Sequence, residues 1–330
     1  MTDSIDMINV PFFQEVNTVD FCHEDAQFAG HESFPLRYSW LSKGYQALSK
    51  NPHLFDSDSA ALELGVGSSM VKSILYWLKA ARLIHVGHKP KSTLAVTTLG
   101  NMIFEEATGA DPYLEDEGTL WLIHWLIASN SRLATTYFWF FNYYHKADFT
   151  ALELSTALND FAQDRVLHSK RSTLATRQRA IQVLLRMYTQ SRSNSQAPIE
   201  DALDSPVSSL GLINHSTGDR TYLSKSDSRM SLPNEIVGFA ILQVMQSRGA
   251  SSIPIEDLMF ANLDSCAPGS VFRLTENDLV RIIEDLIKTM PGDFELRDSG
   301  GINQLYLLAE PSPLALLRKY YDRSNSEVAQ

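Results

Sequence analysis

The first hundred residues alternate between apolar stripes and polar breaks. Apolar side chains recur at spacings of three and four from Tyr38 to Leu48, which predicts a helix that ends at Asn51-Pro52. A short helix over 58–64 and a longer helix from Ser68 follow, joined by a glycine-containing turn at 65–67. Two apolar runs, 83–86 and 93–96, flank a basic tip and predict a hairpin. Two helices, a tight turn and a hairpin are typical of a winged helix.

The longer helix of this unit carries hydroxyl and basic side chains suited to DNA. Recognition helices contact DNA with their N-terminal part, and basic wings reach the phosphate backbone. We therefore expect DNA contacts from residues of the helix and the tip, although many winged helices bind only protein. The candidates are Ser68, Ser69, Lys72, Lys79, Arg82, Lys89 and Lys91.

Residues 99–190 predict a helical region rich in aromatic side chains. Rows of rings at 120–126 and 137–144 could stack exposed bases, but large rings more often form a core. Two further helices are expected over 150–190. The second begins with basic and hydroxyl residues that suit a phosphate, or that form an ordinary solvated face. The basic residues at this helix start are Lys170, Arg171 and Arg177.

The C-terminal part repeats the order of helices and a hairpin. After a polar linker at 191–200, helices are expected over 231–247 and 254–261 and from Thr275, then strands at 294–296 and 304–308 and a terminal helix at 312–321. The third helix is acidic, so we expect this module to pack against protein and not DNA. The predicted fold is mainly α with small β-hairpins, in four parts: an N-terminal arm (1–27), a winged-helix DNA-binding domain (28–98), a helical domain (99–190) and a C-terminal winged-helix-like domain (191–330).

Composition narrows the class of protein. Hydrophobic residues make up 44% and charged residues 20%, as in soluble globular proteins. The acidic start lacks the basic segment of a signal peptide, and no apolar run is long enough to cross a bilayer, so a cytoplasmic protein is expected. Two distant cysteines form no metal-ligand spacing.

The net charge of −11 argues against nonspecific coating of nucleic acid, but charge is distributed in blocks. Residues 31–91 hold eight Lys or Arg against four acids. Residues 165–192 hold seven Lys or Arg and no acid. These two blocks are the predicted DNA-binding regions, because binding depends on local patches.

No established catalytic motif is present, so candidate chemistry rests on one polar cluster. His31, Glu32 and Arg37 stand close together around Pro35. Glu32 or His31 could hold a divalent metal or activate water, and Arg37 could bind a phosphate. Alternatively, Glu32 pairs with Arg37 and His31 caps a helix. A second acidic set at 111–117 could hold a metal or complement a helix dipole.

Three blocks of sequence resemble one bacterial family. They are the run from Phe28 to Leu41, the segment 63–78 with Gly65-Val66-Gly67 and Tyr76-Trp77-Leu78, and the segment 111–121 with Asp111-Pro112-Tyr113. The resemblance runs from about Phe28 to Tyr321. The family it points to is the SspB-like family, which includes the nicking component of a single-strand DNA phosphorothioation system.

This resemblance implies an enzyme that nicks DNA during phosphorothioation and serves host defence, in the manner of restriction-modification. The implied partners are DNA, a cysteine desulfurase, an ATP-using sulfur transferase and an ATPase. Mg²⁺ or Mn²⁺ is the expected cofactor, with Glu32 as the metal ligand. His31, Glu32 and Arg37 become the leading catalytic set. A noncatalytic DNA-binding adaptor that recruits the sulfur-transfer proteins is the alternative, and a transcriptional regulator is a third.

Overall fold

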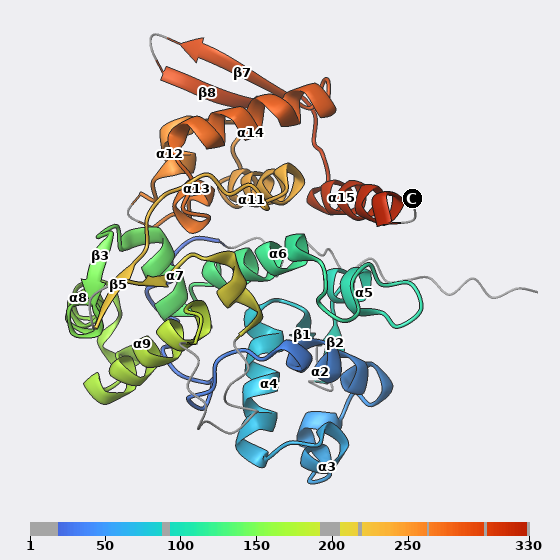
Figure 1. Ribbon diagram of the computed structural model, residues 1–330, viewed down its shortest axis with the longest axis vertical. Coiled ribbons are helices and arrows are strands. Elements are labelled where there is room, and N and C mark those ends of the chain that lie inside the picture. Colours follow the sequence, from blue (N-terminus) through green and yellow to red (C-terminus); the bar gives the residue numbers. More distant parts are fainter. Residues whose placement is uncertain are drawn as a thin grey trace, which may run out of the picture.

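The computed structural model of the chain describes residues 19–87, 93–191, 205–216, 220–262, 264–299 and 302–328. Figure 1 shows a mainly helical molecule, and the strands of the described ranges form small antiparallel sheets. The predicted fold class, mainly α with small β-hairpins, is therefore confirmed.

The N-terminal module follows the predicted order of elements. The periodic spacing after Pro35 becomes a helix whose apolar stripe packs on the next long helix, where Gly44 leaves no room for a Cβ beside Ile74 and Leu78. The basic tip with Lys89 and Lys91 lies outside the described residues, and use of the module as a DNA-binding winged helix stays a prediction. Its elements are α2 (Tyr38–Lys50), η1 (Leu54–Asp56), α3 (Ala60–Leu64), α4 (Ser68–Ala80), β1 (Ile84–Val86), β2 (Leu94–Val96) and α5 (Thr98–Phe104).

The segment before this module is more ordered than its polar pattern suggests. Val19 and Phe21 are buried, and the backbone N–H of Phe21 donates to the carbonyl of Asp264 at 2.6 Å. Farther along, the backbone N–H of Leu167 donates to the carbonyl of His23. Residues 19–27 of the predicted N-terminal arm thus contact the rest of the molecule, while residues 1–18 lie outside the described ranges.

The central region places its aromatic helices in the core, as the more ordinary interpretation of the rings predicted. Trp121, Trp125 and Phe138 are fully buried or nearly so, and no base can stack on them. The sheet β3–β5–β4 was not predicted, because strands of two or three residues carry no measurable period. The elements are α6 (Glu117–Ala128), α7 (Thr135–Tyr143), β3 (Asp148–Thr150), α8 (Ala151–Arg165), η2 (His168–Lys170), α9 (Leu174–Tyr188), η3 (Pro206–Leu210), β4 (Asn214–His215) and β5 (Thr221–Leu223).

The C-terminal module has helices under a three-stranded sheet of order β6–β8–β7, with the long β7–β8 hairpin at the top of Figure 1. Because β5 pairs with both β3 and β4, the described residues of β4 and β5 share a sheet with the central region, although the sequence grouped them with the C-terminal domain. The elements are α11 (Asn234–Ser247), β6 (Ser252–Pro254), α12 (Ile255–Met259), α13 (Pro268–Val271), α14 (Glu276–Thr289), β7 (Phe294–Ser299), β8 (Ile302–Leu307) and α15 (Pro313–Val328).

Candidate active site

The loop 28–35, which carries His31 and Glu32 of the candidate catalytic set, is held between α4 and α9. From α4, the hydroxyl of Ser73 donates to the carbonyl of His31 at 2.6 Å, and the indole of Trp77 donates to the carbonyl of Phe34 at 3.3 Å. From α9, Arg186 Nη2 donates to the carbonyl of Ser33 at 2.6 Å. The loop therefore has anchors on two helices that are far apart in the sequence.

The backbone of this loop adopts uncommon conformations. Gly30 has a φ of 132°, and a Cβ there would overlap the ring of Tyr76. Glu32 and Ser33 have φ values of 47° and 67°, in the left-handed region that side chains disfavour. Such residues cost free energy and persist only where surrounding contacts hold them, which is common at functional sites.

His31 is buried, with its side chain aimed into the protein. Its ring stacks on Trp77 with a centroid distance of 6.1 Å and meets Tyr76 edge-on. Burial, together with the nearby positive charge of Arg186, lowers the pKa of His31 to about 4. The imidazole is therefore neutral at pH 7.

The hydrogen bonds of His31 fix which nitrogen carries the proton. The backbone N–H of Ser33 donates to Nδ1 at 3.2 Å, so a neutral ring carries its proton on Nε2. Nε2 is buried and has no hydrogen-bond partner among the described residues. His31 thus presents an unused N–H donor, and in this tautomer Nε2 can neither bind a metal nor accept a proton. The hydroxyl of Tyr137, whose ring meets Trp77 edge-on, is likewise buried and unpartnered within the described ranges.

The other two members of the predicted set lie nearer the surface. Glu32 is exposed, as its left-handed backbone turns it out of the loop. Arg37 is half-buried, with its guanidinium over the rings of Phe34 and Trp40 at 5.8 and 5.4 Å from their centroids. Neither interpretation of the cluster made from the sequence foresaw this stacking. His31 caps no helix, since α2 begins after Arg37 without a side-chain cap.

Metal binding finds little support in the side chains of the loop. Within the described residues no group of three His, Cys, Asp or Glu is placed to hold an ion. Glu32 would be a single carboxylate, and the neighbouring imidazole offers a donor and not a lone pair. A complete protein-built site does not fit here, and assignment of a divalent metal to Glu32 stays a prediction.

Arg186 is the residue of this site that the sequence did not single out. It is exposed on α9, it holds Ser33, and its charge acts on both His31 and Tyr137. It lies within the basic block 165–192, but nothing local separates it from the other arginines there. Only the packing of α9 against the loop reveals its role.

The predicted DNA contacts on α4 divide into exposed and buried side chains. Ser68, Ser69 and Lys72 are exposed on the first turns of the helix, and Lys79 is half-buried. Burial lowers the pKa of Lys79. Arg82 is buried, and its guanidinium donates to the hydroxyl and carbonyl of Ser129 at 2.9 Å each. Arg82 therefore caps the end of α6 inside the protein, and we leave it out of the proposed DNA surface.

The predicted phosphate site at the start of α9 is mostly committed to internal contacts. Lys170 is exposed and lies 3.4 Å from the carboxylate of Asp25. Arg171 donates to Gln163 and to the carbonyl of Val166. Arg177 is buried and bonds Asn159 and the carbonyl of Ser172, so it also leaves the proposed surface.

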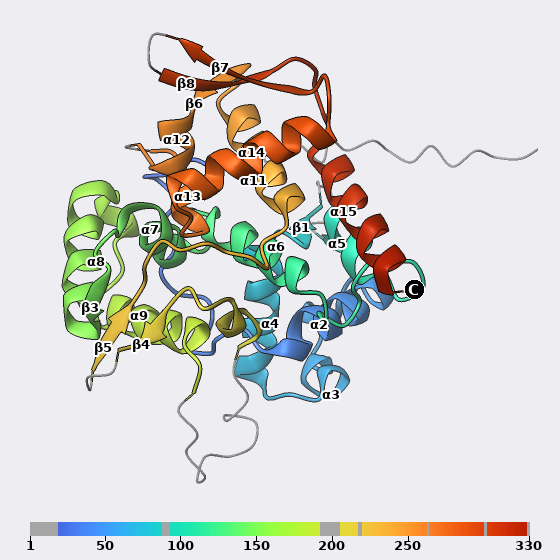
Figure 2. The ribbon, with the colours of Figure 1, turned by 45° about the horizontal axis from the view of Figure 1, so that its top comes forward.

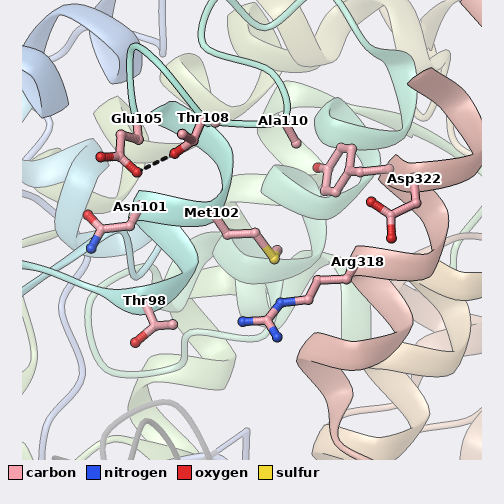
Figure 3. Close-up of a pocket in the computed structure, with 10 residues that line it drawn as sticks. Thr98, Asn101, Met102, Glu105, Thr108, Ala110, Arg318 and Asp322 are labelled. Atoms are coloured by element: carbon pink, nitrogen blue, oxygen red, sulfur yellow. Dashed lines mark hydrogen bonds between the residues drawn. The ribbon is translucent and has the colours of Figure 1, made fainter. Parts of the chain in front are cut away.

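Two other polar features, the acidic segment 111–117 and a pocket between α5 and α15, are candidate ligand sites. The Asp111 carboxylate accepts the backbone N–H groups of Glu115 and Asp116, and Asp116 caps α6, so the acidic set complements a helix start. A pocket of about 370 Å³ lies between α5 and α15 (Figure 3). Its one cation, Arg318, is accompanied by Glu105 and Asp322, which offers little attraction for a phosphate.

Comparisons with known proteins agree with the fold. The family described as "Protein of unknown function (DUF4007)" matches residues 28–321. The structure is similar to an "SspB crystal structure", with 28% identity and a TM-score of 0.78, over 91% of this chain and 90% of that chain. It is also similar to a "Magnesium ion-bound SspB crystal structure", with 28% identity and a TM-score of 0.79, over 90% and 89%. No curated protein shows significant sequence similarity. These findings confirm the SspB-like resemblance, and no helix in the described ranges is long and apolar enough to span a membrane.

Proposed function

This chain belongs to the DUF4007 family, and we propose that it is a DNA-binding nicking endonuclease that acts in single-strand DNA phosphorothioation and host defence. The likeness to SspB over nine-tenths of both chains supports a role in that system. The observation that supports the nicking activity is the loop 28–35, which α4 and α9 hold in place, with Glu32 exposed beside Ser33, the residue that Arg186 binds.

DNA would be held by local charge, since the chain as a whole is acidic. Ser68, Ser69 and Lys72 form an exposed surface at the start of α4, the helix on which the loop rests. Arg186 supplies a second cation on the α9 side of the loop. A strand that crosses the loop would thus have basic contacts on both sides, which fix its position without reading sequence.

The site residues suit hydrolysis of a phosphodiester. A water oxygen bonds to phosphorus while the bond from phosphorus to one ester oxygen breaks. Glu32 takes the proton of that water, and solvent protonates the departing oxygen. Arg186 and Arg37 stabilise the negative charge that develops on the phosphoryl oxygens. The neutral His31 keeps the loop in place, because its Nδ1 accepts from the backbone N–H of Ser33.

A noncatalytic adaptor is the second candidate function, and a specific observation favours it. The imidazole of His31 is buried and its Nδ1 accepts from the backbone N–H of Ser33, so it cannot take a proton from an attacking water. An adaptor would use the same basic surfaces to bring a cysteine desulfurase, an ATP-using sulfur transferase and an ATPase to DNA. It would bind DNA without cutting it.

The deciding experiment incubates the full-length protein with supercoiled plasmid and Mg²⁺ or Mn²⁺, with a chelator arm. Glu32→Gln and Arg186→Gln test the site, and Lys288→Gln on α14 is the control for loss of an exposed charge. Both test side chains are exposed, so the variants should fold. Circular dichroism of each purified variant is the check on its fold. DNA binding is measured in parallel by fluorescence anisotropy.

We expect open-circular product from the wild type and from Lys288→Gln, and little or none from Glu32→Gln, whose DNA binding stays intact. Arg186→Gln should lose both nicking and part of the affinity. Nicking that survives in Glu32→Gln would move the chemistry elsewhere. DNA binding by the wild type without any nick would establish the adaptor.

A further inference from the structure

A groove on the outer face of α8 and α9 has no role in the candidate active site. It has a volume of about 440 Å³ and is lined by Ala151, Leu152, Ser155, Ala175, Gln178, Arg179 and Gln182. The two helices lie side by side in both ribbon views (Figures 1 and 2). No other described element lines this groove, so its side chains face outward.

The lining combines a flat apolar surface with amide groups. Leu152 is 74% exposed, which is unusual for a large apolar side chain, and Ala151 and Ala175 continue the same surface. Gln178 and Gln182 stand one turn apart on α9, and neither amide is hydrogen-bonded to a described residue. A nucleobase has matching features, since its faces are apolar and its edges need both donors and acceptors.

Charge, together with this apolar and amide lining, favours nucleic acid as the occupant. Arg179 lines the groove, is exposed, and makes no ion pair with any described residue. Arg186 follows seven residues later on the same face of α9, a rise of about 10 Å, which matches two or three nucleotides of a strand. Helix α9 carries arginines and no acid from Leu174 to Tyr188.

We propose that the α8–α9 groove holds one unstacked base of the DNA strand bound at the candidate active site. Leu152 and the two alanines contact the face of the base, Gln178 and Gln182 bond its edge, and Arg179 and Arg186 contact the flanking phosphates. The inference rests on the proposed function, because Arg186 links the groove to the loop 28–35.

The test measures anisotropy of the full-length protein with a short single-stranded oligonucleotide and with an abasic strand of the same length. The abasic strand keeps every phosphate and lacks the bases. Gln178→Ala/Gln182→Ala and Leu152→Ser remove the contacts to a base, and Arg179→Gln removes a phosphate contact. Leu174→Ser is the control, because Leu174 is 51% exposed on α9 but does not line the groove.

The wild type should bind the normal strand about ten-fold more tightly than the abasic strand. Gln178→Ala/Gln182→Ala and Leu152→Ser should each lose this preference for the normal strand, and their affinity for the abasic strand should be unchanged. Arg179→Gln should weaken both, and Leu174→Ser neither. Equal wild-type affinity for the two strands would overturn the groove alone and leave a partner protein as its occupant. Absence of binding to either strand and to plasmid would overturn the proposed function as well.

Discussion

Replacement of Arg273 should destabilise the protein more than any ordinary surface change, because its guanidinium is a buried connection between two modules. Arg273 follows α13 and is 4% exposed. It donates to the carbonyls of Phe140 and Tyr144, both at 2.9 Å, and of Phe141 at 3.2 Å, all at the end of α7. It also bonds the hydroxyl of Ser224 and stacks on two rings of α7.

The size of the effect follows from what the substitution leaves behind. Burial lowers the pKa of Arg273 to about 10, helped by the positive charge of Arg229, so the group stays charged at pH 7. Arg273→Met keeps much of the apolar volume but leaves three carbonyls at the end of α7 without this donor. Each buried unsatisfied group costs about 1–3 kcal/mol, and partial relaxation reduces the sum to about 3–5 kcal/mol. Arg273→Lys keeps the charge but not the planar fork, so it should cost about half as much.

Urea unfolding followed by tryptophan fluorescence measures these losses in the free energy of unfolding. Arg281→Met on the surface of α14 is the control, and its exposed ion pairs should contribute about 1 kcal/mol or less. A loss below about 1 kcal/mol for Arg273→Met would refute the reasoning. Equal losses for Met and Lys would show that the fork geometry is unimportant.

Two further predictions concern the interior. Burial holds the pKa of His31 at about 4 and that of His124 at about 3, whereas the unfolded chain takes up these protons near pH 6.5. The stabilisation that comes from keeping these two histidines neutral is therefore complete above pH 6.5 and is lost as the pH falls. Between pH 7 and pH 5 the free energy of unfolding should fall by about 4 kcal/mol for the two together. A free energy of unfolding that stays constant across that range would contradict this. Gly118→Ala should lower the free energy of unfolding by about 1 kcal/mol, although alanine has the better helix propensity. The reason is that the new Cβ would meet the Tyr320 hydroxyl, which donates to Asp116 at 2.8 Å. In a Tyr320→Ala background the added methyl group should carry no penalty.

The sequence predicted the local elements because their signals are local. The spacing of Tyr38, Leu41, Tyr45 and Leu48 gives the buried face of α2, and Thr275 caps α14 where the pattern begins. The aromatic rows of α6 and α7 were correctly assigned to the core on their size alone. In each case the information needed lies within about four turns of helix.

The candidate site was only half predictable, because its other half depends on tertiary contacts. His31 and Glu32 were chosen as a polar cluster, but the protonated Nε2 of His31 follows from a left-handed turn at Ser33 that no composition reveals. Arg186 lies 153 residues from its partner Ser33. Arg82 and Arg177 were misassigned to the surface for the same reason: an arginine with buried hydrogen-bond acceptors has the same local sequence as one in solvent.

Packing also connects the candidate site to the C-terminal module. His31 stacks on Trp77, Trp77 meets Tyr137 edge-on, and Tyr137 contacts Tyr188. The hydroxyl of Tyr188 bonds His124 at 2.8 Å, and His124 donates to the carbonyl of Val271 at 2.9 Å. Every ring in this path is at least nine-tenths buried, and its last member, His124, is the one that contacts the C-terminal module. The modules that the sequence divides thus share one hydrophobic core, and a continuous path of buried contacts joins the loop 28–35 to a residue more than two hundred positions away.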